Sequence, residues 1–382
     1  MPWILAAPIL TLMLVPLACL LERKIRQAKT EATLKIASAD GIDDEYYEKI
    51  GGIEQWISIR SEARNNPVLL VLHGGPGCSY SIFAPHMRAW EKHFTMVQWD
   101  QRGGGKTFAK AGKSRSTPLN FEQLTHDAIQ VTRHICDRLN QSKIFLLASS
   151  LGSTFGTRVV RLRPELFYAY IGTDQNVGMG SAGHNHFNET IERLRVLGLQ
   201  KGVTTLERIG ADPFRWSVKD FEAVAHWTMR SRPADFKRTM KLLKEAVWYS
   251  PRWRLMDIRS FVAGMHYSLE QLLPDIVRYS AWQEEMRFRV PFFVFQGEAD
   301  TLTPPKQAKA FFDDLAAPMK CFRLIPGTGH FAAFLEPQRF LDLLLLHVRP
   351  LADVSADLKG THSRCFEMSR TSPGCPPDQR MR

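Results

Sequence analysis

Short apolar runs alternate with helical segments along this chain, and that alternation limits the possible folds more than any other feature of the sequence. Runs of strand length occupy residues 68–72, 94–99, 144–147, 168–172, 291–296 and 321–325. Strands covered by helices on both faces read as continuous apolar runs. The sequence therefore predicts an α/β protein with a mainly parallel sheet flanked by helices. The chain has 382 residues, 44% of them hydrophobic, which is enough for a large core and excludes wholesale disorder.

One block of the sequence interrupts this alternation. Residues 174–285 show helical periodicity without a convincing buried strand, so we expect a helical cap inserted before the late strands. The predicted core then comprises residues 40–173 and 286–350, with a hairpin around Gly51 and Gly52. Residues 351–382 are polar and rich in Ser, Pro and Gly, and we predict a disordered tail there.

The first 30 residues form a separate segment. Residues 3–21 carry no charge, and at ~1.5 Å per residue a helix of this length spans ~28 Å, about the thickness of a bilayer core. No base precedes this run, as a cleaved signal peptide would require, but four bases against one acid follow it at 22–29. We therefore predict a membrane anchor of one N-terminal helix, with the catalytic domain in the cytoplasm. The alternatives are the signal peptide of an exported or periplasmic protein, a wrongly assigned start codon and a buried helix.

The strongest local signal for chemistry is the sequence LLASSLG at residues 146–152. An apolar strand runs into a tight turn and then a helix, with small residues on both sides of a serine. This matches the G-x-S-x-G turn that exposes a nucleophilic serine, except that Ala148 replaces the first glycine. Gly152 fixes the register, so Ser150 is the predicted nucleophile. The alternative is a serine that only caps the helix.

A nucleophilic serine needs a base that is itself oriented by a carboxylate. Two late strand candidates are followed by loops with such groups, GEAD at residues 297–300 and GTGH at 327–330. Their order in the chain predicts Asp300 as the acid and His330 as the base. Glu298 is a rival for the role of the acid.

Negative charge that develops during the reaction needs backbone donors. Leu151 begins the helix after the serine, where N–H groups are free and the helix dipole favours an anion. The glycines of HGGPG at residues 73–77 let the backbone approach a substrate closely. We predict an oxyanion hole made by the N–H groups of Gly75 and Leu151.

Taken together, these segments resemble those of the proline iminopeptidase-type α/β-hydrolases. The matching segments, in order, are HGGPG at 73–77, DQRGGGKT at 100–107, the serine turn, GEAD at 297–300 and GTGH at 327–330. The similarity covers roughly residues 40–350 and implies an α/β-hydrolase fold with a Ser-His-Asp triad, a helical lid, no cofactor and no metal ion. It also implies that the loops bordering the active site contain His73, Gly74, Asp100, Gln101 and Arg102.

The resemblance implies an enzyme that cleaves an N-terminal residue, proline by preference, from short peptides through an acyl-enzyme on Ser150. Such enzymes use cap carboxylates to hold the free α-amino group of the substrate. This chain instead has GMGSAGHNH at residues 178–186, which contains no acid. A carboxylesterase or lactonase with the same triad is therefore the alternative, and a catalytically silent binding protein is a third interpretation.

The net charge of +11 does not indicate a nucleic-acid partner, because no Lys/Arg run is interleaved with aromatic residues. The expected partners are a small peptide or ester and, through the predicted anchor, a membrane. The six cysteines show no CxxC pair or metal-ligand spacing, so neither a disulfide framework nor a zinc site is expected.

Overall fold

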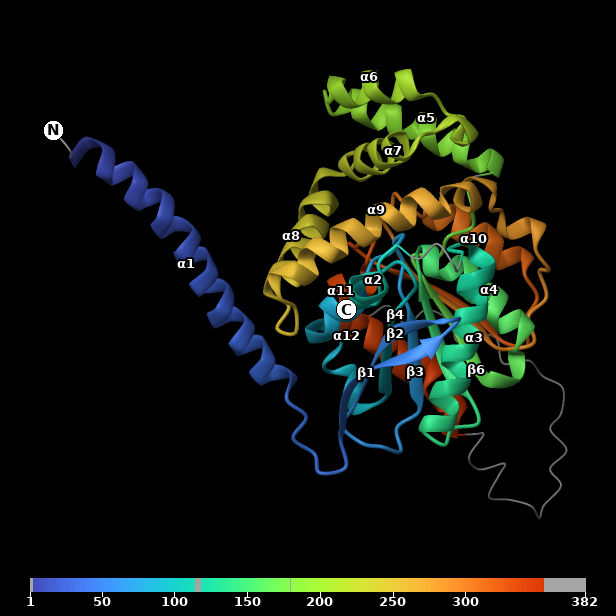
Figure 1. Cartoon of the computed structure of the whole chain (residues 1–382). Coiled ribbons are helices and arrows are strands. Elements are labelled where there is room, and N and C mark those ends of the chain that lie inside the picture. The colour runs from blue at the N-terminus through green and yellow to red at the C-terminus, as the bar shows by residue number, and fades with distance from the viewer. Residues whose placement is uncertain (1–2, 114–117, 179, 354–382) are drawn as a thin grey trace, which may run out of the picture.

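One eight-stranded sheet organises the structure, a computed structural model that describes residues 3–113, 118–178 and 180–353 (Figure 1). Its strands are β1 (Ile42–Ile50), β2 (Ile53–Ser61), β3 (Val68–Leu72), β4 (Thr95–Asp100), β5 (Ile144–Ser149), β6 (Phe167–Thr173), β7 (Phe292–Gly297) and β8 (Lys320–Ile325). They lie in the order β1-β2-β4-β3-β5-β6-β7-β8. The pairs β1–β2 and β2–β4 are antiparallel, and all later pairs are parallel. The predicted mainly parallel sheet is confirmed.

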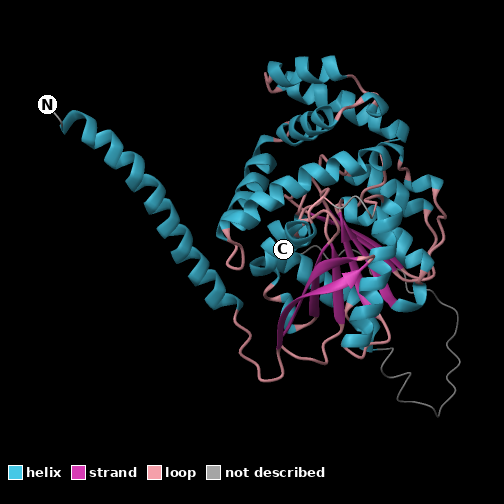
Figure 2. Ribbon diagram, in the orientation of Figure 1, coloured by secondary structure: helices cyan, strands magenta, loops and turns pink. Residues whose placement is uncertain are grey.

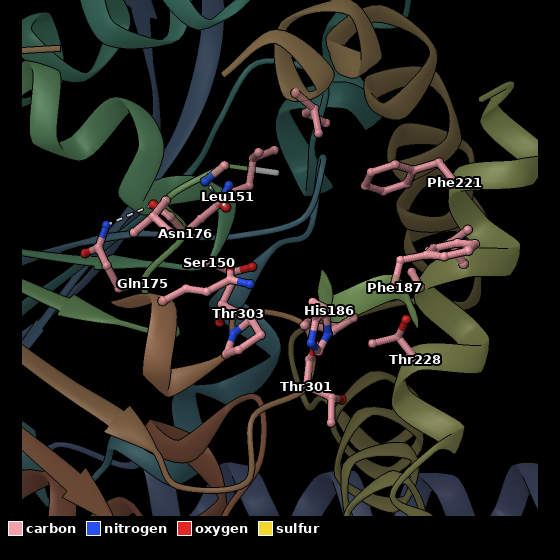
Figure 3. A pocket seen from close by; sticks show the side chains of 18 of the residues that line it. Ser150, Leu151, Gln175, Asn176, His186, Phe187, Phe221, Thr228, Thr301 and Thr303 are labelled. Carbon is pink, nitrogen blue, oxygen red and sulfur yellow. Dashed lines mark hydrogen bonds between the residues drawn. The ribbon is translucent and has the colours of Figure 1, made fainter. Parts of the chain in front are cut away.

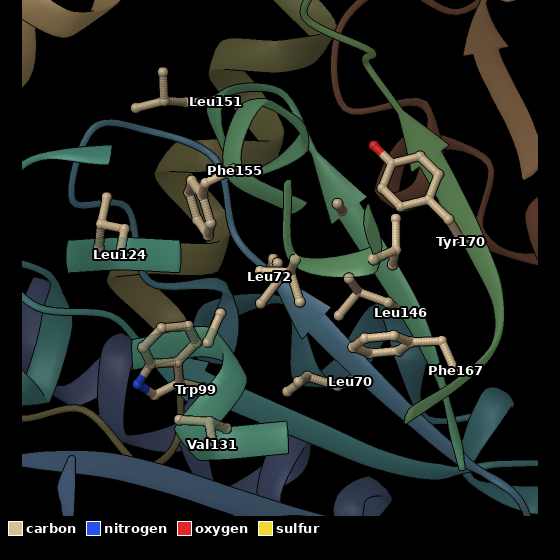
Figure 4. Close-up of a cluster of buried hydrophobic side chains, with 14 of the residues drawn as sticks. Leu70, Leu72, Trp99, Leu124, Val131, Leu146, Leu151, Phe155, Phe167 and Tyr170 are labelled. Atoms are coloured by element: carbon tan, nitrogen blue, oxygen red, sulfur yellow. The ribbon is translucent and has the colours of Figure 1, made fainter. Parts of the chain in front are cut away.

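Helices cover both faces of the sheet (Figure 2). They are α2 (Gly105–Ala111), α3 (Phe121–Arg138), α4 (Leu151–Leu162), α10 (Pro305–Asp314), α11 (Ala332–Leu335), α12 (Pro337–Leu343) and the 3₁₀ segment η1 (Tyr80–Met87). Alternate side chains of the central parallel strands enter two apolar layers: in β3, Leu70 and Leu72 join one layer, and Leu69 and Val71 join the other. Figure 4 shows Phe155 of α4 packed in the first layer beside Leu72. Burial on both faces explains why these strands are continuous apolar runs.

Among the described residues, five α-helices follow one another between β6 and β7, where a helical cap is predicted, and we refer to them as the cap. They are α5 (Gly180–Val196), α6 (Gln200–Ile209), α7 (Val218–Arg230), α8 (Pro233–Tyr249) and α9 (Leu255–Arg278). Figure 1 shows α9 crossing over the sheet, with α5, α6 and α7 beyond it. A separate apolar cluster that includes Leu194, Leu206 and Trp227 joins α5, α6 and α7. The cap therefore has its own small core.

The N-terminal segment differs from the prediction. In the parts of the chain that the structure describes, no helix is long and apolar enough to cross a membrane. The predicted N-terminal anchor and membrane partner are therefore wrong, and the orientation inferred from the anchor loses its basis.

One of the bases that follow the apolar run, Arg23, is packed against protein. Helix α1 (Trp3–Leu34) continues through them, and Arg23 is buried against the turn between α8 and α9. Its guanidinium donates to the carbonyl oxygens of Trp248 and Trp253 at 2.9 and 2.8 Å. One turn later, Gln27 donates to the carbonyl of Ser250 at 2.6 Å. A segment predicted to flank a bilayer is thus packed against protein. The predicted tail lies, from residue 354 onward, outside the described residues.

Candidate active site

The carboxyl ends of the parallel strands meet at one edge of the sheet, and the candidate residues lie there. Ser150 directly follows β5, and the loops after β7 and β8 carry Asp300 and His330. The loop after β3 carries Gly75, and β3 lies between β4 and β5, where the strand order reverses. Such a reversal opens a crevice at the carboxyl edge of a sheet.

The turn at Ser150 is strained and tightly packed. Ser150 has φ 52° and ψ −125°, a conformation that non-glycine residues rarely adopt. A Cβ on Gly152 would lie 2.6 Å from the carbonyl oxygen of His73, so a side chain is excluded at this position. A Cβ on Gly156 would lie only 2.8 Å from that of Ala148. Alanine therefore fits at position 148 because α4 presents a glycine to it.

The structure brings Ser150, His330 and Asp300 together in one hydrogen-bonded row. His330 Nε2 lies 3.1 Å from Ser150 Oγ, and His330 Nδ1 lies 2.9 Å from Asp300 Oδ2. The backbone N–H of Thr303 and the Thr303 hydroxyl also donate to Asp300, which fixes the carboxylate. Glu298 is exposed, and its carboxylate accepts from the N–H of Gly327 rather than from His330. The geometry thus favours Asp300 over Glu298 as the partner of His330.

A second carboxylate, that of Asp174 after β6, lies beside this row. Burial lowers the pKa of His330, but the charges of Asp300 and Asp174 and the hydrogen bond with Asp300 outweigh it and raise the pKa to about 9. Burial also raises the pKa of the Asp174 carboxyl to about 6, against the opposing charge of His330. No sequence motif marks Asp174 as a site residue. Its signal is its position at the end of a strand that lies next to β5.

The two expected oxyanion donors lie at the pocket that contains Ser150. Gly75 and Leu151 both line this pocket. Gly75 has φ 136°, and a Cβ there would lie 2.5 Å from the backbone nitrogen of Gly77. Leu151 is the first residue of α4, where the N–H has no acceptor within the helix. Gly74 passes so close that a Cβ on it would lie 2.8 Å from Ser150 Cβ.

His73 and Gln101 connect the loop after β3 to the loop after β4. His73 Nε2 accepts from the backbone N–H of Gln101 at 3.0 Å, and the Gln101 amide donates to the carbonyl of His73 at 3.0 Å. Burial lowers the pKa of His73 to about 4, so this imidazole is neutral near pH 7. Both side chains are buried and support the loop that carries Gly75.

Asp100 and Arg102 are bonded inside the protein rather than at the pocket. Arg102 donates to both carboxylate oxygens of Asp127, at 3.0 and 3.2 Å. Asp100 accepts from the Ser79 hydroxyl and from the backbone N–H of Lys106. Burial raises the pKa of Asp100 to about 6, although these hydrogen bonds oppose the shift. Neither side chain lines the pocket, so their contacts are with the supporting loops.

The pocket above Ser150 has a volume of about 210 Å³ and lies between the strand ends and the cap (Figure 3). The lining residues that the cap contributes include His186, Phe187, Trp216, Phe221, Val224 and Thr228. None of the described lining residues is Asp or Glu, and the sequence of residues 179–185 contains no acid either. The apolar lining residues have no distinctive sequence signal, because an apolar stripe on a helix has the same pattern whether it faces a core or a pocket.

The two buried carboxylates and the imidazole of the hydrogen-bonded row are also of the types that bind metal ions. One ligand atom each from Asp174, Asp300 and His330 lie within 4.8 Å of one another. Nδ1–H of His330 already donates to Asp300, and Asp174 accepts from the N–H of Phe331 and from the Ser149 hydroxyl. These hydrogen bonds satisfy the buried carboxylates without a metal ion.

Comparison with known proteins agrees with this architecture. A family model described as the alpha/beta hydrolase fold matches residues 67–337. A probable aminopeptidase, YbaC of Bacillus subtilis (strain 168), is 28% identical over 307 residues, which cover 78% of this chain and 94% of that protein. A putative esterase/lipase of Haemophilus influenzae is 31% identical over 114 residues, 29% of this chain and 35% of that protein. The crystal structure of a proline iminopeptidase-related protein from Thermus thermophilus superimposes with a TM-score of 0.54 at 18% identity, covering 81% of this chain and 99% of the other. At that identity the structural likeness concerns the fold alone.

Proposed function

Since the chain belongs to the α/β-hydrolase family, we propose that it is a serine hydrolase whose catalytic triad is Ser150, His330 and Asp300. The row of hydrogen bonds from Ser150 Oγ through His330 to Asp300 carries this proposal. Nδ1–H of His330 donates to the carboxylate, so Nε2 is left to accept the serine proton. The strained turn holds Oγ at the pocket.

In the proposed mechanism, Ser150 Oγ attacks the acyl carbon while His330 Nε2 takes its proton. The N–H groups of Gly75 and Leu151 stabilise the oxyanion of the tetrahedral intermediate. The imidazolium then protonates the leaving group, and an acyl-enzyme remains on Ser150. Water, deprotonated by His330, releases the acid and restores the serine.

We propose that the substrate is a carboxylic ester and that its acyl group is uncharged and apolar. The pocket wall formed by the cap is dominated by Phe187, Trp216, Phe221 and Val224, and its described lining residues include no carboxylate. A free α-ammonium group buried there would lack an ionic partner, which costs several kcal/mol for a desolvated ion. An uncharged acyl chain gains free energy from the same wall.

Two esters of similar shape test this preference. The p-nitrophenyl esters of cyclopentanecarboxylic acid and of proline differ in the acyl ring by one ammonium group. We expect kcat/KM to be at least about tenfold higher for the cyclopentane ester, the equivalent of ~1.4 kcal/mol. Ser150→Ala should abolish both activities and also labelling by a fluorophosphonate. A preference for the proline ester would overturn the substrate assignment, and labelling of Ser150→Ala would overturn the triad.

The second candidate is an aminopeptidase that acts on an N-terminal residue, by preference proline. Two observations favour it: the HGGPG and DQRGGGKT segments, and the 28% identity to a probable aminopeptidase over most of both chains. This activity requires polar groups of the pocket, such as the amides of Gln175 and Asn176, to bind the ammonium group in place of a carboxylate. Rapid release of p-nitroaniline from prolyl p-nitroanilide, with slow cleavage of the cyclopentane ester, would support it.

A further inference from the structure

Asp174 is a buried acid beside the triad, and it has no role in the proposed acyl-transfer steps. It directly follows β6, is fully buried and has φ 50°, a left-handed conformation that is rare for a residue with a side chain. Its Oδ1 accepts from the backbone N–H of Phe331 at 3.1 Å, and its Oδ2 accepts from the Ser149 hydroxyl at 3.0 Å. Phe331 and Ser149 are the chain neighbours of His330 and Ser150. The carboxylate is thus bonded to both catalytic loops.

We propose that Asp174 is a positioning residue that acts on His330 by charge and by orientation, as a second acid beside Asp300. This inference rests on the proposed serine-hydrolase mechanism. The ligand atoms of Asp174, Asp300 and His330 lie within 4.8 Å of one another, so the imidazole faces two carboxylates. At such distances in a buried site, an opposite charge strongly favours the protonated imidazole.

The consequence for catalysis has two opposite parts. A second negative charge stabilises the imidazolium that forms when Ser150 is deprotonated, which lowers the barrier to attack. The same charge makes His330 harder to deprotonate in the free enzyme, so the active form requires a higher pH. A carboxylate that only held the two loops together would change neither the charge of His330 nor the pH at which it titrates.

Other titratable groups around the triad come from several elements. Tyr80 of η1 interacts electrostatically with Asp174, and His186 of α5 interacts with Asp300. Asp235 of α8 and Glu298 after β7 lie at Gly329 and Gly327, in the loop that carries His330. The Tyr80 hydroxyl bonds to the Ser149 hydroxyl, His186 Nε2 donates to the carbonyl oxygen of Thr301, and Asp235 lies beside Gly329. None of them replaces the carboxylate of Asp174 between Ser149 and Phe331.

The pH dependence of kcat/KM tests the proposal, with Asp174→Asn as the variant and Ser149→Ala as its matched control. Asparagine removes the charge, whereas Ser149→Ala removes one hydrogen bond of Asp174 and leaves the charge in place. We expect the rising limb of kcat/KM to move to lower pH by about 1–3 units in Asp174→Asn, with a lower plateau. The limb should keep its position in Ser149→Ala. A limb that stays in place in Asp174→Asn, or moves equally in Ser149→Ala, would overturn the proposal.

An NMR titration provides a test that does not depend on activity or on the folding of Asp174→Asn. In Asp300→Asn, Asp174 is the remaining acid of the pair, so His330 should still titrate above its ordinary pKa of 6.5. Its ring-proton signal is assigned by its loss in His330→Gln. Titration at or below 6.5 in Asp300→Asn would overturn the proposal, because burial alone lowers the pKa of an imidazole. A wild-type protein without hydrolase activity would refute the proposed function instead, and the NMR result would still decide the role of Asp174.

Discussion

The contact between Ala148 and Gly156 gives a prediction whose sign depends on the residue opposite. Gly156 lies inside α4, where alanine normally stabilises a helix by ~0.5–1 kcal/mol relative to glycine. At this position, however, the new Cβ would lie 2.8 Å from Ala148 Cβ, well inside the ~3.5–4.0 Å at which two carbon atoms attract. The other neighbours, side-chain atoms of Leu72 and Tyr170, are at an acceptable 3.4 Å. The clash is therefore with one methyl group on β5.

We expect Gly156→Ala to destabilise the protein, because α4 must move away from β5. Overpacking of a buried site costs ~1–3 kcal/mol, of which the gain in helix propensity offsets up to ~1 kcal/mol. In an Ala148→Gly background the clashing methyl is absent, so the same substitution should stabilise by ~0.5–1 kcal/mol. The coupling free energy between the two positions should then be ~1–3 kcal/mol.

Urea unfolding of the wild type, both single variants and the double variant, followed by tryptophan fluorescence, measures each free energy of unfolding. The rate of fluorophosphonate labelling provides a second readout, since α4 begins one residue after Ser150 and its displacement should slow labelling in Gly156→Ala. The double variant should recover both properties. Stabilisation by Gly156→Ala in both backgrounds would refute our explanation of why alanine fits at position 148.

Four further outcomes follow from the contacts described above. Arg102→Gln leaves the buried carboxylate of Asp127 without its ion pair and should lower the free energy of unfolding by ~3–5 kcal/mol, while Asp127→Asn in the same chain should recover part of the loss. The kcat/KM of the wild type should rise with pH through about 9, because His330 must be neutral to accept the serine proton and its pKa is raised; a flat profile between pH 6 and pH 9 would contradict this. Prolonged treatment with EDTA should leave ester hydrolysis unchanged, and a loss that added metal restores would assign a metal to the site. Arg23→Met should free α1 from the turn between α8 and α9, which accelerated trypsin cleavage after Lys24 would report, whereas unchanged cleavage would contradict the observed docking.

Much of the candidate site could be predicted because its parts are local in sequence. The turn around Ser150 requires small residues on a short segment, so LLASSLG alone indicates the strand, the turn and the helix. Asp300 and His330 follow short, mainly apolar runs that predict strands, and parallel strands bring their carboxyl ends to one edge. The fold class and the order of the core elements follow from the same alternation.

The N-terminal segment shows where local reading was wrong. An uncharged run followed by bases has the pattern of a membrane anchor, and nothing within the segment reveals that Arg23 is buried against carbonyl groups more than 220 residues away. In the described part of the chain no membrane-spanning helix is present. Hydrogen bonds between distant segments leave no periodic signal in the sequence.

By itself, then, the sequence determined the mainly parallel sheet and predicted an inserted cap and a nucleophile, because each depends on neighbouring residues or on the chain order of strands. Only the tertiary structure distinguished Asp300 from Glu298, placed Asp174 beside His330 and turned apolar cap residues into a pocket wall without a carboxylate. Electrostatic and packing interactions depend on distances of a few ångströms between groups far apart in the chain. Those distances exist only once the strands, loops and cap have come together.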